Sequence, residues 1–122
     1  SVTWIGETRG IHGLLAAADV VALPAENLYA KMDLPLVLIE AMLLERAVVV
    51  ATGAPAEELA EGGAAIAASP DVDATVHAIE SVLFDHKMRG LVGSRARQSA
   101  LDRYHPAVVA RAYEGLYDEL LQ

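Results

Sequence analysis

The sequence predicts an α/β protein with three layers, in which a partial parallel β-sheet is covered by helices on both faces. Short runs that are apolar at every position alternate with longer runs of helical period. Strands that are apolar on both faces are typical of parallel sheets buried between helices. Beyond residue 88, two further helical runs follow each other with no strand between them, so two extra C-terminal helices are expected.

Composition sets the class of protein. The chain has 122 residues, enough for one domain, and we place no domain boundary within 1–122. Its 9 Lys and Arg against 17 Asp and Glu give a net charge of −8, which argues against a nucleic-acid partner because phosphate binding needs clustered cations. The absence of cysteine excludes disulfides and thiolate metal sites and makes a reducing cytoplasm the default expectation. No transmembrane segment or signal peptide is expected, and the Ala- and Arg-rich composition hints at a bacterial source.

The first elements are short. Val2–Gly6 is a β-branched and aromatic run that ends in Gly, and it predicts a strand. Val20–Leu23 is apolar on both faces and stops at Pro24, which predicts a second strand. Between them, apolar residues at i, i+3, i+4 and i+7 predict an amphipathic helix with one buried face: Ile11, Leu14, Leu15 and Ala18.

The middle of the chain predicts a buried helix and the clearest strand. Leu36–Leu44 is rich in Leu, Met and Ala and reads as a buried helix. Val48–Ala51 contains three successive β-branched residues, which disfavour a helix. Pro55–Glu61 is expected to form a short helix with Pro in its first turn, followed by a weak strand over Ala64–Ala68.

The last part of the chain is helical. Asp71–Phe84 has an acidic first turn that suits the helix dipole, and its inward-facing residues are expected to be Val76, Ile79 and Leu83. Met88–Tyr104 and Pro106–Leu121 are the two extra helices, and the second carries one apolar stripe: Val109, Ala112, Tyr113, Leu116 and Leu120. Two helices cannot both cover so small a sheet, so one of them should pack elsewhere, or against something absent.

Candidate binding residues follow from the expected sheet. In doubly wound sheets, ligands bind outside the carboxyl ends of the strands, where the loops after Leu23 and after Ala51 meet. The helix that begins near Pro35 points its N-terminus to that edge, which favours an anion such as a diphosphate. Glu40 is the one charge in this apolar helix, so it either bonds backbone or Arg46, or faces the crevice and accepts hydrogen bonds from a ligand's hydroxyls.

The histidines offer no metal site by their spacing. They lie on different elements without ligand-type intervals, and surface or capping roles are expected for His12, His77, His86 and His105. No nucleophile elbow, Walker loop or glycine-rich dinucleotide fingerprint is present.

The order of the segments carries a family resemblance. The chain contains, in succession, VTWIG, LLAAADVVALP, LPLVLIEAM, RAVVVATGAPAEEL and GGAAIAASPDVDA. This succession resembles the C-terminal domain of the group 1 glycosyltransferases, which are retaining enzymes of the glycosyltransferase B (GT-B) fold that transfer a sugar from a nucleotide-sugar donor. The resemblance extends to the closing LYDELL helix and implies a Rossmann-like nucleotide-sugar-binding domain.

The resemblance assigns roles to several residues. In the family, a Glu followed by Phe-Gly stands eight positions before a second Glu, which holds the ribose hydroxyls of the nucleotide. The second Glu corresponds to Glu40, whereas the first, which contacts the donor sugar, corresponds to Met32. Asp33 or Lys31 could substitute for it by reaching over, although nothing in the sequence demands it. The Phe-Gly corresponds to Leu34-Pro35, and Pro has no N–H to donate, so recognition of the donor sugar must differ here or has been lost.

Two loops complete the expected site. Gly6 and Glu7 match the loop that borders the nucleobase in relatives, although a plain strand-ending Gly explains them nearly as well. Gly53 and Glu58 resemble a Gly-Gly-x-x-Glu pattern near the donor sugar and phosphate; Glu58 is preferred over Glu57 because Leu59 then follows as the family's apolar residue does. A solvated helix face accounts for either Glu about equally well.

The resemblance implies that the chain is the later half of a nucleotide-binding domain. In relatives, the Arg and Lys that bind the diphosphate lie before a residue equivalent to Ser1, and a whole N-terminal domain binds the acceptor and receives the final helix. We therefore expect a fragment that binds the donor nucleotide but cannot turn over alone, with no metal or other cofactor required. The alternative is a non-catalytic interaction module that kept the fold.

The family order also predicts the sheet. The strands over Val20–Leu23, Val48–Ala51 and Ala64–Ala68 should be consecutive neighbours. Val2–Ile5 would be left unpaired, which is costly, so it should either move beside Val20–Leu23, or two chains should associate into a homo-oligomer through the exposed strand and the two tail helices.

Overall fold

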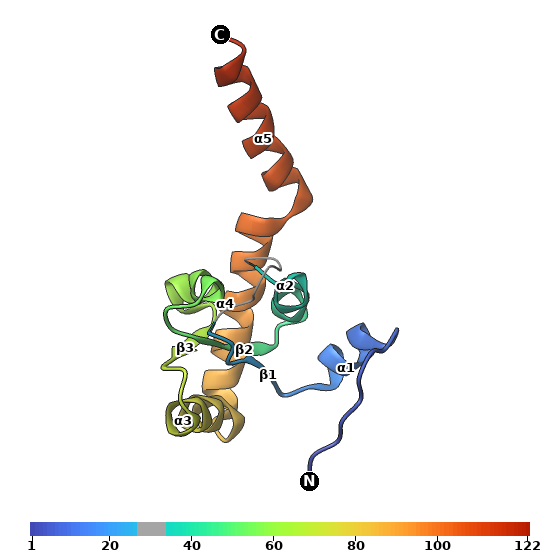
Figure 1. Cartoon of the computed structure of the whole chain (residues 1–122), viewed down its shortest axis with the longest axis vertical. Coiled ribbons are helices and arrows are strands. Elements are labelled where there is room, and N and C mark those ends of the chain that lie inside the picture. Colours follow the sequence, from blue (N-terminus) through green and yellow to red (C-terminus); the bar gives the residue numbers. More distant parts are fainter. Residues whose placement is uncertain (27–33) are drawn as a thin grey trace.

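The structure is a computed structural model that describes residues 1–26 and 34–122. Figure 1 shows its elements in chain order. They are α1 (Ile11–Ala17), β1 (Val20–Leu23), α2 (Leu36–Leu43), β2 (Ala47–Ala51), the 3₁₀ helix η1 (Pro55–Gly63), β3 (Ile66–Ala68), α3 (Val72–Leu83), α4 (His86–Tyr104) and α5 (Pro106–Leu120). In the described ranges, no helix is both long and apolar enough to cross a membrane.

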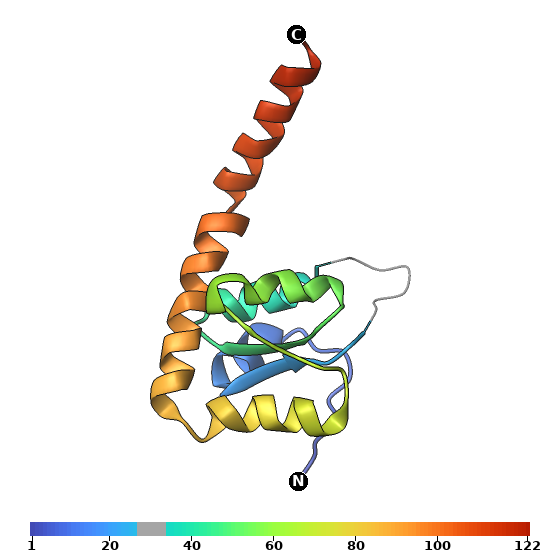
Figure 2. The same ribbon diagram turned by 90° about the vertical axis from the view of Figure 1, so that its left-hand side faces the viewer.

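The described strands form one parallel sheet in the order β1-β2-β3, as predicted for three of the strands. Val21 pairs with Val48, and Val49 pairs with Ile66. All five residues of β2 are buried, because helices cover both faces of this central strand. Figure 2 shows the sheet between α3 on one face and α2 with η1 on the other. The three-layer α/β prediction is therefore confirmed.

The two faces of β2 alternate with residue number, as the pleat of a strand requires. Val48 and Val50 pack into the main core with α2, η1 and α4, whose largest buried contributions come from Leu38, Met42 and Leu59. Ala47 points to the other face and packs with Val82 of α3 and Val92 of α4. The core thus uses small and β-branched side chains, which allow helices to approach the sheet closely.

The helix ends follow local chemistry. Asp71 caps α3 by accepting the backbone N–H of Ala74 at 2.8 Å, and Asp85 caps α4 by accepting that of Met88 at 3.0 Å. Just past the end of α2, Glu45 takes a positive φ of 59°, the conformation that Gly usually supplies at this position. A side chain disfavours this left-handed conformation, so the turn forms with a strained residue.

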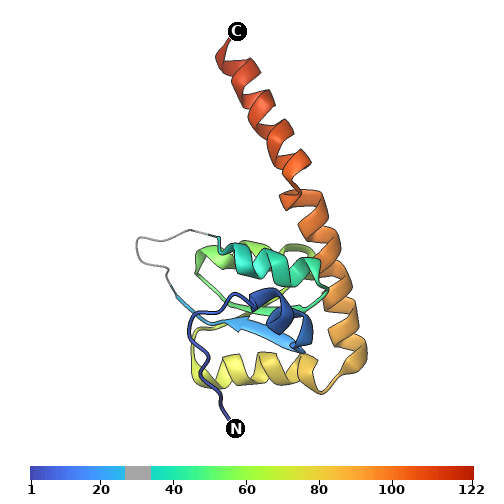
Figure 3. The same ribbon diagram turned by 90° about the vertical axis from the view of Figure 1, so that its right-hand side faces the viewer.

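The two extra helices behave differently. α4 packs on α2, on α3 and on β2, and its Gly93 lies directly against the carbonyl of Glu45 at the amino end of β2. α5 has no buried residue and projects away from the rest of the molecule (Figures 1 and 3). The expectation that one of these helices does not cover the sheet is therefore confirmed.

Three local predictions are wrong. Val2–Gly6 is not a strand: Val2 is 98% exposed and Trp4 92%. Because α1 docks through Leu15 onto the main core, the segment before it emerges on the far side of α1 from β1 (Figure 1), where no strand is within reach. Strand propensity alone cannot replace a hydrogen-bonding neighbour. The expected pairing beside Val20–Leu23 is accordingly absent from the described sheet.

The other two corrections concern the buried face of α3 and the length of β3. Val76 is exposed, and α3 instead buries Ala78 and Val82, because the helix is rotated so that this pair meets the sheet. The short helix predicted over Pro55–Glu61 is confirmed; it is a 3₁₀ helix, and the segment continues to Gly63 past a kink at Glu61 and Gly62. The strand predicted over Ala64–Ala68 is shorter than expected, because only Ile66–Ala68 pairs with β2.

Candidate functional site

The carboxyl edge of the sheet is formed by the loops after β1, β2 and β3. In Figure 2 this edge lies opposite the side that α4 crosses. α2 runs antiparallel to the strands, so its N-terminus at Pro35 lies at this edge, as predicted. Pro35 is the extended residue that precedes α2, and no side chain of the described residues caps this helix. Met32 and Asp33, as well as Lys31, lie outside the described residues.

Glu40 lies in the second turn of α2 and faces α1. Its Oε1 is 3.2 Å from Nε2 of His12, and its side chain is 40% exposed. Arg46 does not contact it: the guanidinium donates to the carbonyls of Leu44 at 2.9 Å and Ala18 at 3.2 Å. Of the alternatives for Glu40, pairing with Arg46 is thus wrong, and the carboxylate stays accessible beside α1.

Gly6 and Glu7 line a hollow of about 600 Å³ at the start of α1, together with Thr8, Arg9 and Ile11. Gly6 takes a φ of +71°, which favours Gly at this bend. Ile11 is followed directly by His12, the residue that contacts Glu40. The residues predicted to bind the nucleotide therefore lie on neighbouring segments. Gly6 and Glu7 lie at the start of α1, and Glu40 lies on α2, which contacts α1.

The loop after β2 is held by Glu57 and not by Glu58. Gly53, with a φ of +77°, donates its N–H to Oε2 of Glu57 at 2.8 Å. Glu58, one residue later, points the other way: its Oε1 accepts the hydroxyl of Tyr104 at 3.1 Å, and its carbonyl accepts from Arg103. Leu59 is fully buried, as expected of the apolar residue in the motif. Gly53 and Glu58, the two residues matched to the Gly-Gly-x-x-Glu pattern, thus bond different partners.

Electrostatics distinguish one group near η1. Burial, followed by the charge of Glu58, raises the pKa of Tyr104 above its usual value of 10.0, because both disfavour the phenolate. The guanidinium of Arg103, 5.2 Å from the centre of the Tyr104 ring, acts in the opposite direction.

The histidines have separate roles. His105 caps α5 by accepting the N–H of Ala107 at 3.1 Å, and Nδ1 of His86 lies 2.7 Å from Arg89. The predicted capping role is therefore confirmed for His105. Within residues 1–26 and 34–122, no three His, Asp or Glu side chains gather in a way that could hold a metal ion.

Sequence reasoning missed two residues at this edge, His12 and Glu57. His12 reads as one of several surface histidines, and no local signal shows that α1 will place it beside Glu40. Glu57 had a signal: it stands four residues after Gly53, a spacing that allows a carboxylate to reach back to the loop's N–H. The choice of Glu58 followed the family register instead.

Comparison with known protein families gives one result. The sequence profile described as "Glycosyl transferases group 1" matches residues 1–85, which is more than half of the chain. A comparison with curated proteins returned no significant match. The matched range contains the whole sheet, α2 and the loops of the carboxyl edge. The chain therefore belongs to the group 1 glycosyltransferase family.

Proposed function

We propose that the chain is the nucleotide-sugar-binding portion of a retaining glycosyltransferase and forms the later half of its C-terminal domain. The single observation that carries this proposal is Glu40. It is an accessible carboxylate in an apolar helix whose N-terminus lies at the carboxyl edge of the sheet, and its contact His12 directly follows Ile11, which lines the hollow of Gly6 and Glu7. A carboxylate in such a position accepts two hydrogen bonds from a vicinal diol, which is the chemistry that a ribose offers.

In this proposal, the nucleotide lies across the start of α1 and α2. Glu40 accepts the ribose hydroxyls, and in doing so competes with His12 for the same oxygens. The base lies in the hollow of Gly6 and Glu7, whose volume of about 600 Å³ exceeds that of a nucleobase. Both contacts come from elements that the described core holds in place through Leu15 and Leu38.

The diphosphate extends from the ribose toward the N-terminus of α2. Backbone N–H groups and the helix dipole stabilise negative charge there, and cationic side chains from the upstream half of the domain complete the site. With these groups the departing diphosphate needs no metal ion. Transfer proceeds with retention in the intact enzyme, after an N-terminal domain has positioned the acceptor.

The donor sugar meets Leu34, Pro35 and the Gly53 loop. Pro35 offers no N–H, and the N–H of Gly53 is already bonded to Glu57. A sugar hydroxyl at this loop therefore has two options. It displaces the Glu57 carboxylate and bonds the N–H of Gly53, or it leaves that bond intact and bonds the carboxylate. Either arrangement differs from the family's Glu and Phe-Gly pattern.

The experiment is an NMR titration of the 122-residue chain with UDP, GDP and ADP. Without the diphosphate cations we expect a Kd of about 1 mM, near −4 kcal/mol, with shifts centred on Glu40 and the Gly6 loop. Glu40→Gln should weaken binding about tenfold, because it removes charge-assisted bonds to the diol. The control Glu80→Gln, an exposed carboxylate on α3, should leave the Kd unchanged.

A modified nucleotide makes this test specific for the ribose contact. 2′-DeoxyADP lacks one of the two hydroxyls, so it should bind the unaltered chain less tightly than ADP and should lose little more in Glu40→Gln. Such non-additivity is expected when both changes remove one interaction. Additive losses, or shifts confined to surfaces remote from Glu40, Gly6 and Gly53, would contradict the assignment.

The exposed face of α5 supports a second candidate, a non-catalytic interaction module. Its apolar stripe includes Tyr113, Leu116 and Leu120, which are 56%, 49% and 72% exposed. A module of this kind needs the stripe and does not need Glu40. The absence of any nucleotide-induced shift at Glu40, together with partner binding that is lost in Leu116→Asp, would favour it over the transferase.

A further inference from the structure

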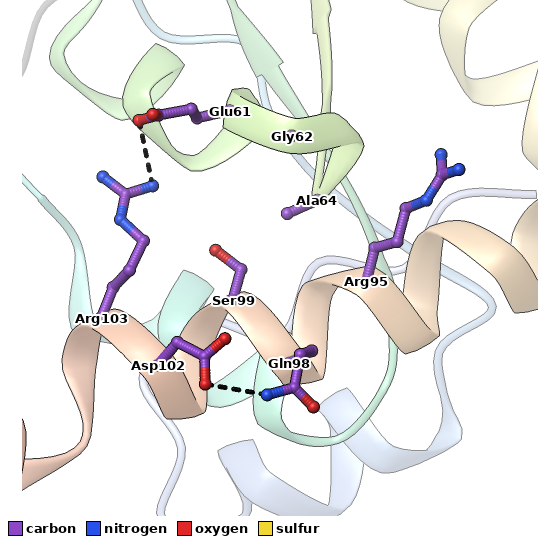
Figure 4. A pocket seen from close by; sticks show the side chains of 8 residues that line it. All are labelled: Glu61, Gly62, Ala64, Arg95, Gln98, Ser99, Asp102 and Arg103. Atoms are coloured by element: carbon purple, nitrogen blue, oxygen red, sulfur yellow. Dashed lines mark hydrogen bonds and ion pairs between the residues drawn. The ribbon is translucent and has the colours of Figure 1, made fainter.

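His12 and Glu40 form one of the two pairs of opposite charge in the described ranges. Nε2 of His12 lies 3.2 Å from Oε1 of Glu40, and the two side chains are 70% and 40% exposed. The other pair joins Arg103 to Glu61 across the space between α4 and η1 (Figure 4). Histidine is the side chain that ordinarily changes charge between about pH 5 and 8. Of the two described pairs, the one at Glu40 is therefore the pair whose strength depends on pH in that range.

The protonation state of His12 decides how firmly it holds the carboxylate. A carboxylate only accepts hydrogen bonds, so Nε2 of His12 must carry a proton when it bonds Oε1 of Glu40. A neutral imidazole has one ring proton, which can lie on Nε2 or on Nδ1. An imidazolium carries both protons and a positive charge, so it always donates from Nε2 and is also attracted to the carboxylate. Protonation of His12 therefore strengthens its contact with Glu40.

The elements around this pair leave its charges uncompensated. α1 carries no other charged side chain, and Glu40 is the single charge of α2, the helix on which α1 packs. Before α1, the hollow is lined by one acid and one base, Glu7 and Arg9. Arg46, which follows α2, donates to two backbone carbonyls. In the described ranges, His12 is thus the one group able to bring a positive charge into contact with Glu40.

We propose that His12, through its protonation, determines how strongly the site prefers ribose over 2′-deoxyribose. This inference rests on the proposed binding of the ribose diol by Glu40. When His12 is neutral, its exposed ring can turn away, and both oxygens of Glu40 accept the hydroxyls of the diol. When His12 is protonated, it holds Oε1, and the diol must compete with it for that oxygen. The preference for ribose therefore falls as the pH is lowered.

A comparison of ADP with 2′-deoxyADP isolates this effect. An imidazolium also attracts the diphosphate, and the diphosphate itself takes up a proton in acid. Both nucleotides carry the same base and the same diphosphate, so these contributions cancel in the ratio of their Kd values. We call the Kd of 2′-deoxyADP divided by that of ADP the ribose preference. Its change with pH reports the competition for the carboxylate alone.

The experiment is an NMR titration of the chain with both nucleotides at about pH 8 and at about pH 5.5. The ribose preference should be about fivefold at the higher pH, where the diol has the carboxylate to itself. It should fall to about twofold or less at the lower pH. The change is modest because the His12–Glu40 pair is exposed, and an exposed ion pair alters an affinity by at most about fivefold.

Two variants identify the responsible group. His12→Gln keeps a neutral donor of similar reach that cannot be protonated, so its ribose preference should be the same at both pH values. α1 docks onto the core through Leu15, so this exposed substitution should leave the fold intact, which circular dichroism verifies. The control His77→Gln lies on α3, on the opposite face of the sheet, and should retain the full change with pH.

The possible outcomes separate this inference from the proposed function. A ribose preference that is the same at both pH values, or that changes equally in His12→Gln, would overturn the role of His12 and leave the ribose contact of Glu40 intact. A preference that rises in acid would likewise overturn it, because the imidazolium would then assist the diol. Equal Kd values for the two nucleotides at both pH values would refute the ribose contact itself, and the role of His12 with it.

Discussion

Of the glycines, Gly93 has the least space for a side chain. α4 crosses the amino end of β2 with its backbone against the turn that follows α2. A Cβ at Gly93 would lie 2.2 Å from the carbonyl oxygen of Glu45 and 3.0 Å from its carbonyl carbon. These are backbone atoms, so no side-chain rotation relieves the clash. In Gly93→Ala, either α4 or the Glu45 turn must therefore move by about 1 Å. The movement disturbs the packing of the core, which is close-packed.

Gly90, one turn earlier in the same helix, provides a matched control. A Cβ there meets no heavy atom within 4 Å. Gly90→Ala should therefore stabilise the protein by about 0.5–1 kcal/mol through helix propensity alone. Gly93→Ala has the same propensity gain but an overpacking cost of about 1–3 kcal/mol, and more if α4 separates from β2. We expect a net loss of about 1–2 kcal/mol.

Urea unfolding followed by circular dichroism measures both variants. With a slope of about 1.5 kcal/mol per M, the midpoint of Gly93→Ala should fall by about 1 M, and that of Gly90→Ala should rise slightly. Two-state behaviour should be checked with a second probe of the core, such as the NMR signals of the methyl groups of Val48 and Leu59, which are fully buried. If Gly93→Ala proved as stable as Gly90→Ala, the close approach of α4 to the Glu45 turn, and with it the docking of α4 described here, would be wrong.

Three further predictions concern the turn, the pH dependence and catalysis. Glu45→Gly should stabilise the protein by about 1 kcal/mol in the same unfolding assay, because Glu45 has a φ of 59° that Gly adopts without strain; an equal or lower midpoint would contradict this. The raised pKa of Tyr104 contributes stability that is fully present below its usual pKa of 10.0 and is lost as pH rises through the raised value. Tyr104→Phe should therefore be less stable by about 1 kcal/mol below that pH, with the difference shrinking above it, and a gap independent of pH would exclude this linkage. The isolated chain should release no nucleotide from sugar nucleotides above background, because orientation of donor and acceptor in a closed cleft supplies about 7–11 kcal/mol of such a barrier; release that Glu40→Ala abolishes would show the opposite.

Local signals were sufficient for most of the scaffold. The β-branched run of β2, the apolar run of α2 and the acidic start of α3 each predict the element that forms there, because these signals act within one or two turns of chain. The order of the three strands followed from the family resemblance. The family itself could be recognised from the order of the motifs, and the profile match confirms it.

For the predicted site residues, the sequence identifies the residue, whereas the packing of the helices decides its contact. Glu40 stands out in the sequence as a lone charge in an apolar helix, but only the packing of α1 on α2 shows that its described contact is His12. Gly53 is recognisable as a loop glycine, yet it is the curvature of η1 that brings Glu57 to its N–H and turns Glu58 toward Tyr104. Neighbouring residues on a helix face different directions, so a sequence offset of one changes the partner entirely.

What the sequence by itself determined, then, is the class, the family and the succession of elements, since propensity, capping and apolar period are encoded in adjacent residues. Tertiary structure alone decided that Val2–Gly6 remains unpaired, that α4 docks on β2 through Gly93, and that α5 projects without a buried residue. Each of these outcomes depends on whether a distant segment lies within hydrogen-bonding or packing distance. A strand needs a neighbour and a helix face needs a surface, and the positions of both are set only when the whole core has assembled.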